Sequence, residues 1–286
     1  MRVLSAACLL LLCASSASAE TSPSYTTEVV SIPSGTLKLR ALLGRPNGSG
    51  PFPAYISNHG SMTTQEATRA PRTQIARGSL PDALARTGFV VLVLARRGYM
   101  GSEGTATTYS QSHGSGGYSG RRAADVMRGA EEEASDVVAT LEYLLTLPHV
   151  DPERISVGGV SLGGLVSVMA AARDARFKAV ISMAGGYRQG GQGGVDEAWP
   201  LVQGVWKNGA QKIQAPVLIL WSKNDMMLHE DEGRQLEKEL RRLGKSVEMK
   251  VYPDFRDNGH FLFTRAEGYP VYVPDAVSFL ETHLKR

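Results

Sequence analysis

The chain has 286 residues, of which 42% are hydrophobic and 21% are charged, and its formal net charge is +3 with histidine neutral. A chain of this length can form one large domain that buries roughly three-quarters of its unfolded surface. The near balance of charges argues against nucleic acid and against an anionic membrane as partners.

The first 19 residues have the organisation of a secretory signal peptide. Arg2 supplies a positive end, an apolar run continues through Cys13, and Ala17-Ser18-Ala19 fits the pattern of small residues before a cleavage site. The apolar run is too short to span a bilayer, and Leu12 stands where a lipid anchor on Cys13 would need a small residue. We therefore expect cleavage after Ala19 and export of a protein with the mass of residues 20–286 to the periplasm or the medium.

Removal of this segment would leave a chain without cysteine. Cys8 and Cys13 are the two cysteines, and both precede residue 20. The mature protein would then have no disulfide, no thiolate metal site and no cysteine nucleophile. Arg2 is the single charged side chain lost with the segment, so the balance of charges hardly changes.

After this leader the sequence alternates between extended and helical patterns. Residues 26–46 predict two strands joined by a turn at Pro33-Ser34-Gly35. Further along, short apolar runs predict strands and runs with helical spacing predict helices. The predicted strands are 52–60, 89–95, 154–160, 177–185, 216–222 and 246–252, and the predicted helices are 80–87, 123–146, 162–174, 230–243 and 273–284.

Strands rich in Val, Ile and Leu that alternate with helices indicate an α/β fold, with a mostly parallel central sheet covered by helices on both faces. The sequence shows no repeat and no linker, so we expect residues 20–286 to form a single domain. Two glycine-rich loops, 101–120 and 185–194, are longer than ordinary connections. Loops of this kind often carry function, and we expect them to frame the mouth of a site.

The predicted strand 154–160 leads directly into the motif Gly159-Val160-Ser161-Leu162-Gly163. A G-x-S-x-G motif between a strand and a helix is typical of a nucleophile elbow, in which a sharp turn exposes the serine hydroxyl. Glycines on either side leave room for that turn. Ser161 is therefore the candidate nucleophile, although the same pattern also fits a tight turn with a capping serine.

A serine nucleophile needs a base, and the base needs an acid to orient it. Asp225 follows the predicted strand 216–222, and His260 lies in the loop after the next strand. These two residues are the candidate acid and base. The rival acids are close in sequence and remain open at this point: Glu230, Asp231, Asp254 and Asp257.

An oxyanion site requires two backbone N–H groups near the nucleophile. The first is expected from Leu162, which directly follows the serine. The second is expected from Ser61 in the loop after "NHG", with Met62 as the runner-up, and Gly60 would allow the backbone to approach the substrate closely. We expect His59 to hold this loop rather than to transfer protons.

Five segments together resemble the α/β-hydrolase fold and, within it, the dienelactone-hydrolase-like family, which borders on the prolyl-oligopeptidase-type peptidases. These segments are "NHGS", "ARRGYMGSEG", "DPERISVGGVSLGG", "APVLILWSKND" and "DNGHFLF". The resemblance implies Ser161 as nucleophile, Asp225 as acid and His260 as base. The chain departs from the family at two places, because the namesake enzymes have a cysteine at the position of Ser161 and a His-Gly pair at Trp221-Ser222.

Several weaker features complete the picture. Tyr187, Trp199 and Trp206 follow the strand 177–185 and could form an apolar wall for a short acyl or alcohol group, or simply pack in the core. The acidic run 131–133 indicates a solvated helix face rather than a site for an amine. The chain has no metal-binding or phosphate-binding motif, so we expect no metal and no cofactor.

Taken together, these features predict an exported serine esterase that cleaves small to medium carboxylic esters through an acyl-enzyme. A peptidase or amidase with the same triad is the alternative, disfavoured because the chain has little room for a substrate-gating domain. A binding protein that keeps the fold without catalysis is a third possibility, against which the complete set of Ser161, Asp225 and His260 argues. The expected partner is a small-molecule ester, with no nucleic acid and no membrane.

Overall fold

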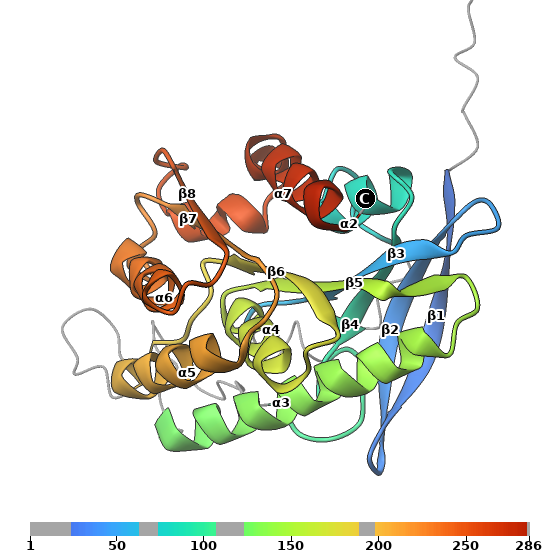
Figure 1. Ribbon diagram of the computed structural model, residues 1–286, viewed down its shortest axis with the longest axis horizontal. Helices are drawn as coiled ribbons and strands as arrows, with labels where there is room; N and C mark the ends of the chain where they lie inside the picture. The colour runs from blue at the N-terminus through green and yellow to red at the C-terminus, as the bar shows by residue number, and fades with distance from the viewer. Residues whose placement is uncertain (1–23, 63–73, 107–122, 189–197, 285–286) are drawn as a thin grey trace, which may run out of the picture.

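The computed structural model describes residues 24–62, 74–106, 123–188 and 198–284, which form one eight-stranded sheet in the order β1-β2-β4-β3-β5-β6-β7-β8 (Figure 1). The strands are β1 (Tyr25–Ser34), β2 (Leu37–Pro46), β3 (Phe52–Asn58), β4 (Val90–Ala95), β5 (Val150–Val160), β6 (Phe177–Met183), β7 (Val217–Ser222) and β8 (Val247–Tyr252). Both pairings of β2 are antiparallel, and the pairings from β4 through β8 are parallel.

Helices cover both faces of the sheet. They are α2 (Leu80–Arg86), α3 (Ala123–Leu145), α4 (Leu162–Arg173), α5 (Trp199–Lys212), α6 (Glu230–Arg242) and α7 (Tyr269–Leu284), with short 3-10 helices η1 (Gly259–Phe263) and η2 (Ala266–Gly268). Figure 1 shows α2 and α7 on one face and α3, α4, α5 and α6 on the other. The α/β fold predicted from the sequence is confirmed, with a mostly parallel sheet between two layers of helices.

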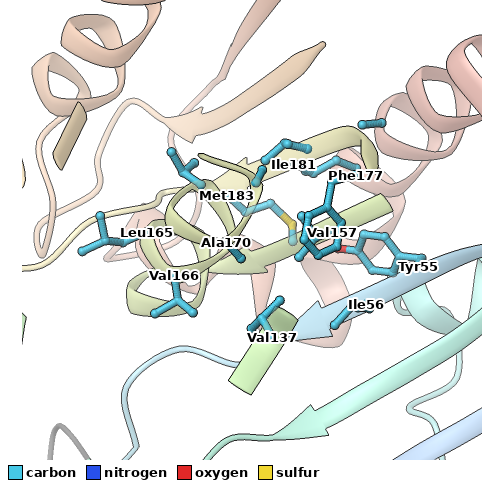
Figure 2. Close-up of a cluster of buried hydrophobic side chains, with 14 of the residues drawn as sticks. Tyr55, Ile56, Val137, Val157, Leu165, Val166, Ala170, Phe177, Ile181 and Met183 are labelled. Carbon is cyan, nitrogen blue, oxygen red and sulfur yellow. The ribbon is translucent and has the colours of Figure 1, made fainter. Parts of the chain in front are cut away.

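The central strands lie in the core because nearly every residue in them is apolar. All six residues of β7, "VLILWS", are buried, as are five of the six in β4, "VVLVLA". A strand buried on both faces needs this continuous pattern rather than alternation. Figure 2 shows the centre of the core, where Val157 of β5 and Ile56 of β3 lie near Val137 of α3 and Val166 of α4.

Three of the strands and α-helices differ from the sequence-based prediction by more than two residues. Strand β5 begins at Val150 rather than at 154, because Val150 pairs with Phe52 before the register shifts. Helix α7 begins at Tyr269 rather than at 273, because Pro270 stands in its first turn, where proline is tolerated. Helix α5 was not predicted, since Gly204 and Gly209 interrupt its apolar pattern.

Some predictions concern residues outside the described ranges. The predicted signal peptide lies there, as do most of the loop 101–120 and residues 189–194 of the loop 185–194. Among the helices that the structure does describe, none combines the length and hydrophobicity required to cross a bilayer.

Candidate active site

Ser161 occupies the sharp turn between β5 and α4. Its backbone has φ +57° and ψ −126°, a conformation that is uncommon for any residue with a side chain. Its N–H donates to the Met183 carbonyl at 2.9 Å, and its carbonyl accepts from the Gly164 N–H at 2.9 Å. These bonds hold the strained turn that a nucleophile elbow requires.

Glycines surround this turn because three chain segments meet there without space for side chains. A Cβ on Gly159 would lie 2.6 Å from the carbonyl oxygen of Asn58 in the neighbouring strand. On Gly163 it would overlap the His59 carbonyl oxygen, and on Gly164 it would lie 2.7 Å from the Gly185 Cα. The close contacts bring the loop after β3 directly against the start of α4.

Asp225 and His260 form a buried pair at the same end of the sheet. The Asp225 Oδ2 lies 2.8 Å from the His260 Nδ1, and each residue is only 5% exposed. The other oxygen, Oδ1, accepts the N–H groups of Met227 and Leu228, both at 2.9 Å. The carboxylate is thereby held in one orientation, with one oxygen directed at the imidazole.

The rival acids lie elsewhere. Asp254 and Asp257 are exposed, Asp231 is exposed, and Glu230 pairs with Arg234 along α6. Among the described residues, Asp225 is the one carboxylate that bonds the His260 ring.

Two asparagines that sequence reasoning missed connect the loops that carry the acid and the histidine, and a tryptophan holds the acid-bearing loop to β7. The Asn258 Oδ1 accepts the N–H groups of His260 at 3.0 Å and Met226 at 3.1 Å. The Asn224 side chain accepts from the Phe255 N–H at 2.9 Å. The Trp221 Nε1 donates to the Leu228 carbonyl at 3.0 Å. An asparagine directly before Asp225 and another two residues before His260 were the available signals.

The predicted oxyanion groups lie on both sides of Ser161. Leu162 is the first residue of α4, so its N–H has no acceptor within the helix. Across from it, Gly60 is close enough that a Cβ there would lie 3.3 Å from the Ser161 Cβ. Ser61 and Met62 follow Gly60 and line the same cavity as Ser161.

That cavity has a volume of about 640 Å³ and lies between the sheet and the α2–α7 layer. Ser161 and His260 both line it, whereas Asp225 lies behind the histidine. Its other walls come from the oxyanion loop, strands β2 to β6, the start of α2 with the residues before it, the loop after β7, and the segment from η1 to α7. The lining includes Leu42 of β2, Tyr55 of β3 and Tyr272 of α7.

The described walls of this cavity are uncharged. No Lys, Arg, Asp or Glu occurs among the described residues that line it. Burial raises the pKa of the Tyr55 phenol and also that of the Tyr272 phenol, so both stay neutral at ordinary pH. The cavity therefore suits a neutral, largely apolar group.

The predicted aromatic wall is wrong in its location. Trp199 and Trp206 lie on α5, and Trp206 is 1% exposed on the face of that helix which packs into the core. Tyr187 is also buried in the core. Helix α5 covers the opposite face of the sheet from α2 and α7 (Figure 1), so Trp199 and Trp206 lie away from the cavity. Tyr187 does not line the cavity either.

The acidic run 131–133 is likewise more than a solvated face. Glu131 pairs with Arg173, and Glu132 pairs with Arg97 at 2.6 Å. Glu133 is fully buried and pairs with Arg96 at 2.6 Å.

Across the described ranges, no three His, Cys, Asp or Glu side chains come close enough together to hold a metal ion.

Comparison with known proteins places this geometry among hydrolases. The model of the dienelactone hydrolase family matches residues 78–278. A solved structure described as a putative dienelactone hydrolase from Klebsiella pneumoniae is similar over 92% of this chain and 99% of its own, with a TM-score of 0.62 and 17% identity.

Peptidases are also similar, over a smaller share of their length. The acylaminoacyl peptidase of Pyrococcus horikoshii has a TM-score of 0.66 and 17% identity, with 92% of this chain and 42% of that chain covered. The "Uncharacterized peptidase YuxL" of Bacillus subtilis is 26% identical over 186 residues, which are 58% of this chain and 27% of that relative. The chain thus spans less than half the length of these two proteins.

Proposed function

Since the chain belongs to the dienelactone hydrolase family, we propose that it is a serine hydrolase acting as a carboxylesterase on neutral esters of small to medium size. One observation supports this most strongly. The strained Ser161 and the Asp225-bound His260 line one uncharged cavity. A nucleophile, an oriented base and an apolar binding space are the parts that acyl transfer requires.

The proposed reaction begins with attack of the Ser161 Oγ on the ester carbonyl. His260 accepts the hydroxyl proton at Nε2, while its Nδ1–H donates to Asp225, and the N–H groups of Leu162 and Ser61 bind the oxyanion. Collapse of the tetrahedral intermediate expels the alcohol, which takes the proton from His260. Water then attacks the acyl-enzyme with the same base, and the carboxylic acid leaves.

Ester substrates are favoured over peptides for two reasons. An alkoxide leaves readily from the tetrahedral intermediate, whereas an amide nitrogen must first be protonated by a well-placed imidazolium. In addition, the described cavity walls hold no carboxylate for a peptide's amino terminus and no cation for its carboxylate. The peptidase alternative is supported by the neighbours that carry that description.

The dimensions of the cavity suggest acyl chains of medium length. Leu42 lies on β2, three strands away from β5, the strand that leads to Ser161. At about 4.8 Å between neighbouring strands, the distance from β2 to β5 is roughly 14 Å. We expect kcat/KM for p-nitrophenyl esters to rise from acetate, peak between hexanoate and decanoate, and fall by palmitate. Each methylene adds about 0.8 kcal/mol only while it finds buried apolar surface.

A variant that shortens this cavity provides the control. Leu42→Trp should lower kcat/KM for the decanoate ester at least about tenfold and leave that for the acetate ester within threefold. An acetate optimum in the wild type, or equal losses on both esters, would show that the acyl chain binds elsewhere.

Peptide p-nitroanilides separate the esterase from the peptidase. We expect the best anilide to be cleaved at least about a thousandfold more slowly than the best ester on the same preparation, a gap of roughly 4 kcal/mol in activation free energy. A peptide anilide that is cleaved faster than every ester would assign the protein to the peptidases.

A further inference from the structure

A buried ion pair lies directly beneath the predicted oxyanion loop. Arg96 follows β4, Glu133 lies on α3, and neither side chain is exposed at all. The Arg96 Nε donates to the Glu133 Oε2 at 2.6 Å. A buried pair of this kind is weak evidence for stability, because the cost of desolvating both charges can exceed their attraction. Its position therefore calls for another explanation.

The remaining donors of Arg96 are directed at the backbone of the loop after β3. The Arg96 Nη1 donates to the His59 carbonyl, and Nη2 lies 3.5 Å from the Gly60 carbonyl. The Gly60 carbonyl also accepts from the His59 Nδ1 at 2.7 Å. Two successive carbonyls are thus turned toward the guanidinium and the imidazole.

The His59 ring is locked in one tautomer by its two neighbours. A carbonyl oxygen can only accept, so Nδ1 must carry the proton that it donates to Gly60. The other ring nitrogen, Nε2, then accepts from the Arg96 backbone N–H at 3.4 Å. Both ring nitrogens of the neutral His59 are thus hydrogen-bonded to backbone groups. This fits a residue that holds the loop and leaves neither nitrogen free for proton transfer.

Because the peptide bond is planar, the orientation of the Gly60 carbonyl also determines the direction of the Ser61 N–H. In a trans peptide the C=O and the following N–H point in opposite directions. With the Gly60 carbonyl held toward Arg96, the Ser61 N–H must point the other way. Gly60 lies against Ser161 and Ser61 lines the cavity, so that direction leads to the place where an oxyanion would form.

We propose that Arg96, oriented by Glu133, is a positioning residue that aims the Ser61 N–H at the oxyanion. This inference rests on the proposed acyl-transfer function. Removing one oxyanion donor costs on the order of 10²–10³-fold in kcat in serine hydrolases. A loosened donor should cost less, and we expect roughly 10- to 100-fold.

The test replaces the buried pair by apolar residues, Arg96→Met with Glu133→Leu, because such exchanges often preserve stability. We expect kcat for p-nitrophenyl hexanoate to fall roughly 10- to 100-fold with KM within threefold. The inhibition constant of butylboronic acid, which forms a tetrahedral adduct with an active serine, should rise by a similar factor. Arg96→Lys keeps a charge for Glu133 but cannot reach both carbonyls. Its kcat and its inhibition constant for the boronic acid should therefore lie between those of the wild type and those of the double variant.

The neighbouring ion pair provides the matched control. Arg97 bonds Asp136 at 2.7 Å between the same two elements and lies outside the cavity walls. Arg97→Met with Asp136→Leu should therefore leave kcat and boronate inhibition within threefold of wild type. Its Tm shows how much a comparable loss of contacts destabilises the fold.

The outcomes separate this inference from the proposed function. An active wild type whose Arg96→Met, Glu133→Leu variant is folded and keeps at least half of kcat and of boronate affinity would overturn the inference alone. Should the double variant not fold, Arg96→Lys decides, since unchanged kcat and boronate affinity in that variant overturn the inference as well. A wild type without any ester hydrolysis would instead refute the proposed function.

Discussion

Replacing Ser161 by Ala or His260 by Ala is expected to lower kcat on the best ester by about 10⁶-fold, or about 8 kcal/mol of activation free energy. Ser161 stands at the turn with φ +57°, and His260 lines the same cavity while bonded to Asp225. Because nucleophile and base act in one step, the loss of either leaves the other without a function. The double variant should therefore be no slower than either single variant.

Each of these variants must be shown to fold like the wild type. The circular dichroism spectrum of each variant should match that of the wild type. His229→Ala is the matched control, since His229 is an exposed histidine four residues beyond the acid and should keep full kcat. A Ser161→Ala protein with a tenth of wild-type turnover would contradict the mechanism.

Asp225→Asn is expected to lower kcat by about 10⁴-fold, less than loss of the nucleophile or base. The Asp225 Oδ2 now accepts from the His260 Nδ1 at 2.8 Å, which leaves Nε2 free to take the serine proton. An amide at this position can donate to Nδ1 and so favour the wrong tautomer. The loss of kcat should appear with little change in Tm, because the side chains are nearly isosteric.

The control for this variant is Asp257→Asn. Asp257 lies three residues before His260 but is exposed, and the carboxylate bonded to the imidazole is that of Asp225. We expect its kcat to stay within twofold of wild type. If Asp257→Asn were inactive and Asp225→Asn normal, the assignment of the acid would be reversed.

Local patterns predicted most of the fold because each depends on neighbours in the chain. Continuous apolar runs such as "VLILWS" mark strands buried on both faces, and they appear as β7 and its neighbours. The glycines around Ser161 indicated a crowded turn, and the structure shows backbone from β3 and from Gly185 packed against them. These features can be read from a single segment at a time.

Features that depend on distant segments could not be predicted in this way. Nothing near Glu133 in the sequence reveals that Arg96, 37 residues earlier, makes it a buried partner. Trp206 is a large aromatic residue of the kind that often lines a pocket, but the helix that carries it covers the face of the sheet opposite to the cavity. The cavity itself combines β2, β3, β4, α2 and α7, whose meeting depends on the order of strands in the sheet.

The most direct test of the central claim is labelling with a fluorophosphonate probe, followed by intact-mass measurement and peptide mapping. Such probes phosphonylate a serine only when a neighbouring base activates it. We predict one label per chain on the peptide that contains Ser161, no label on Ser161→Ala, and full labelling of the His229→Ala control. A folded wild type that stays unlabelled, or a Ser161→Ala protein that is still labelled, would contradict the assignment of Ser161 as the nucleophile.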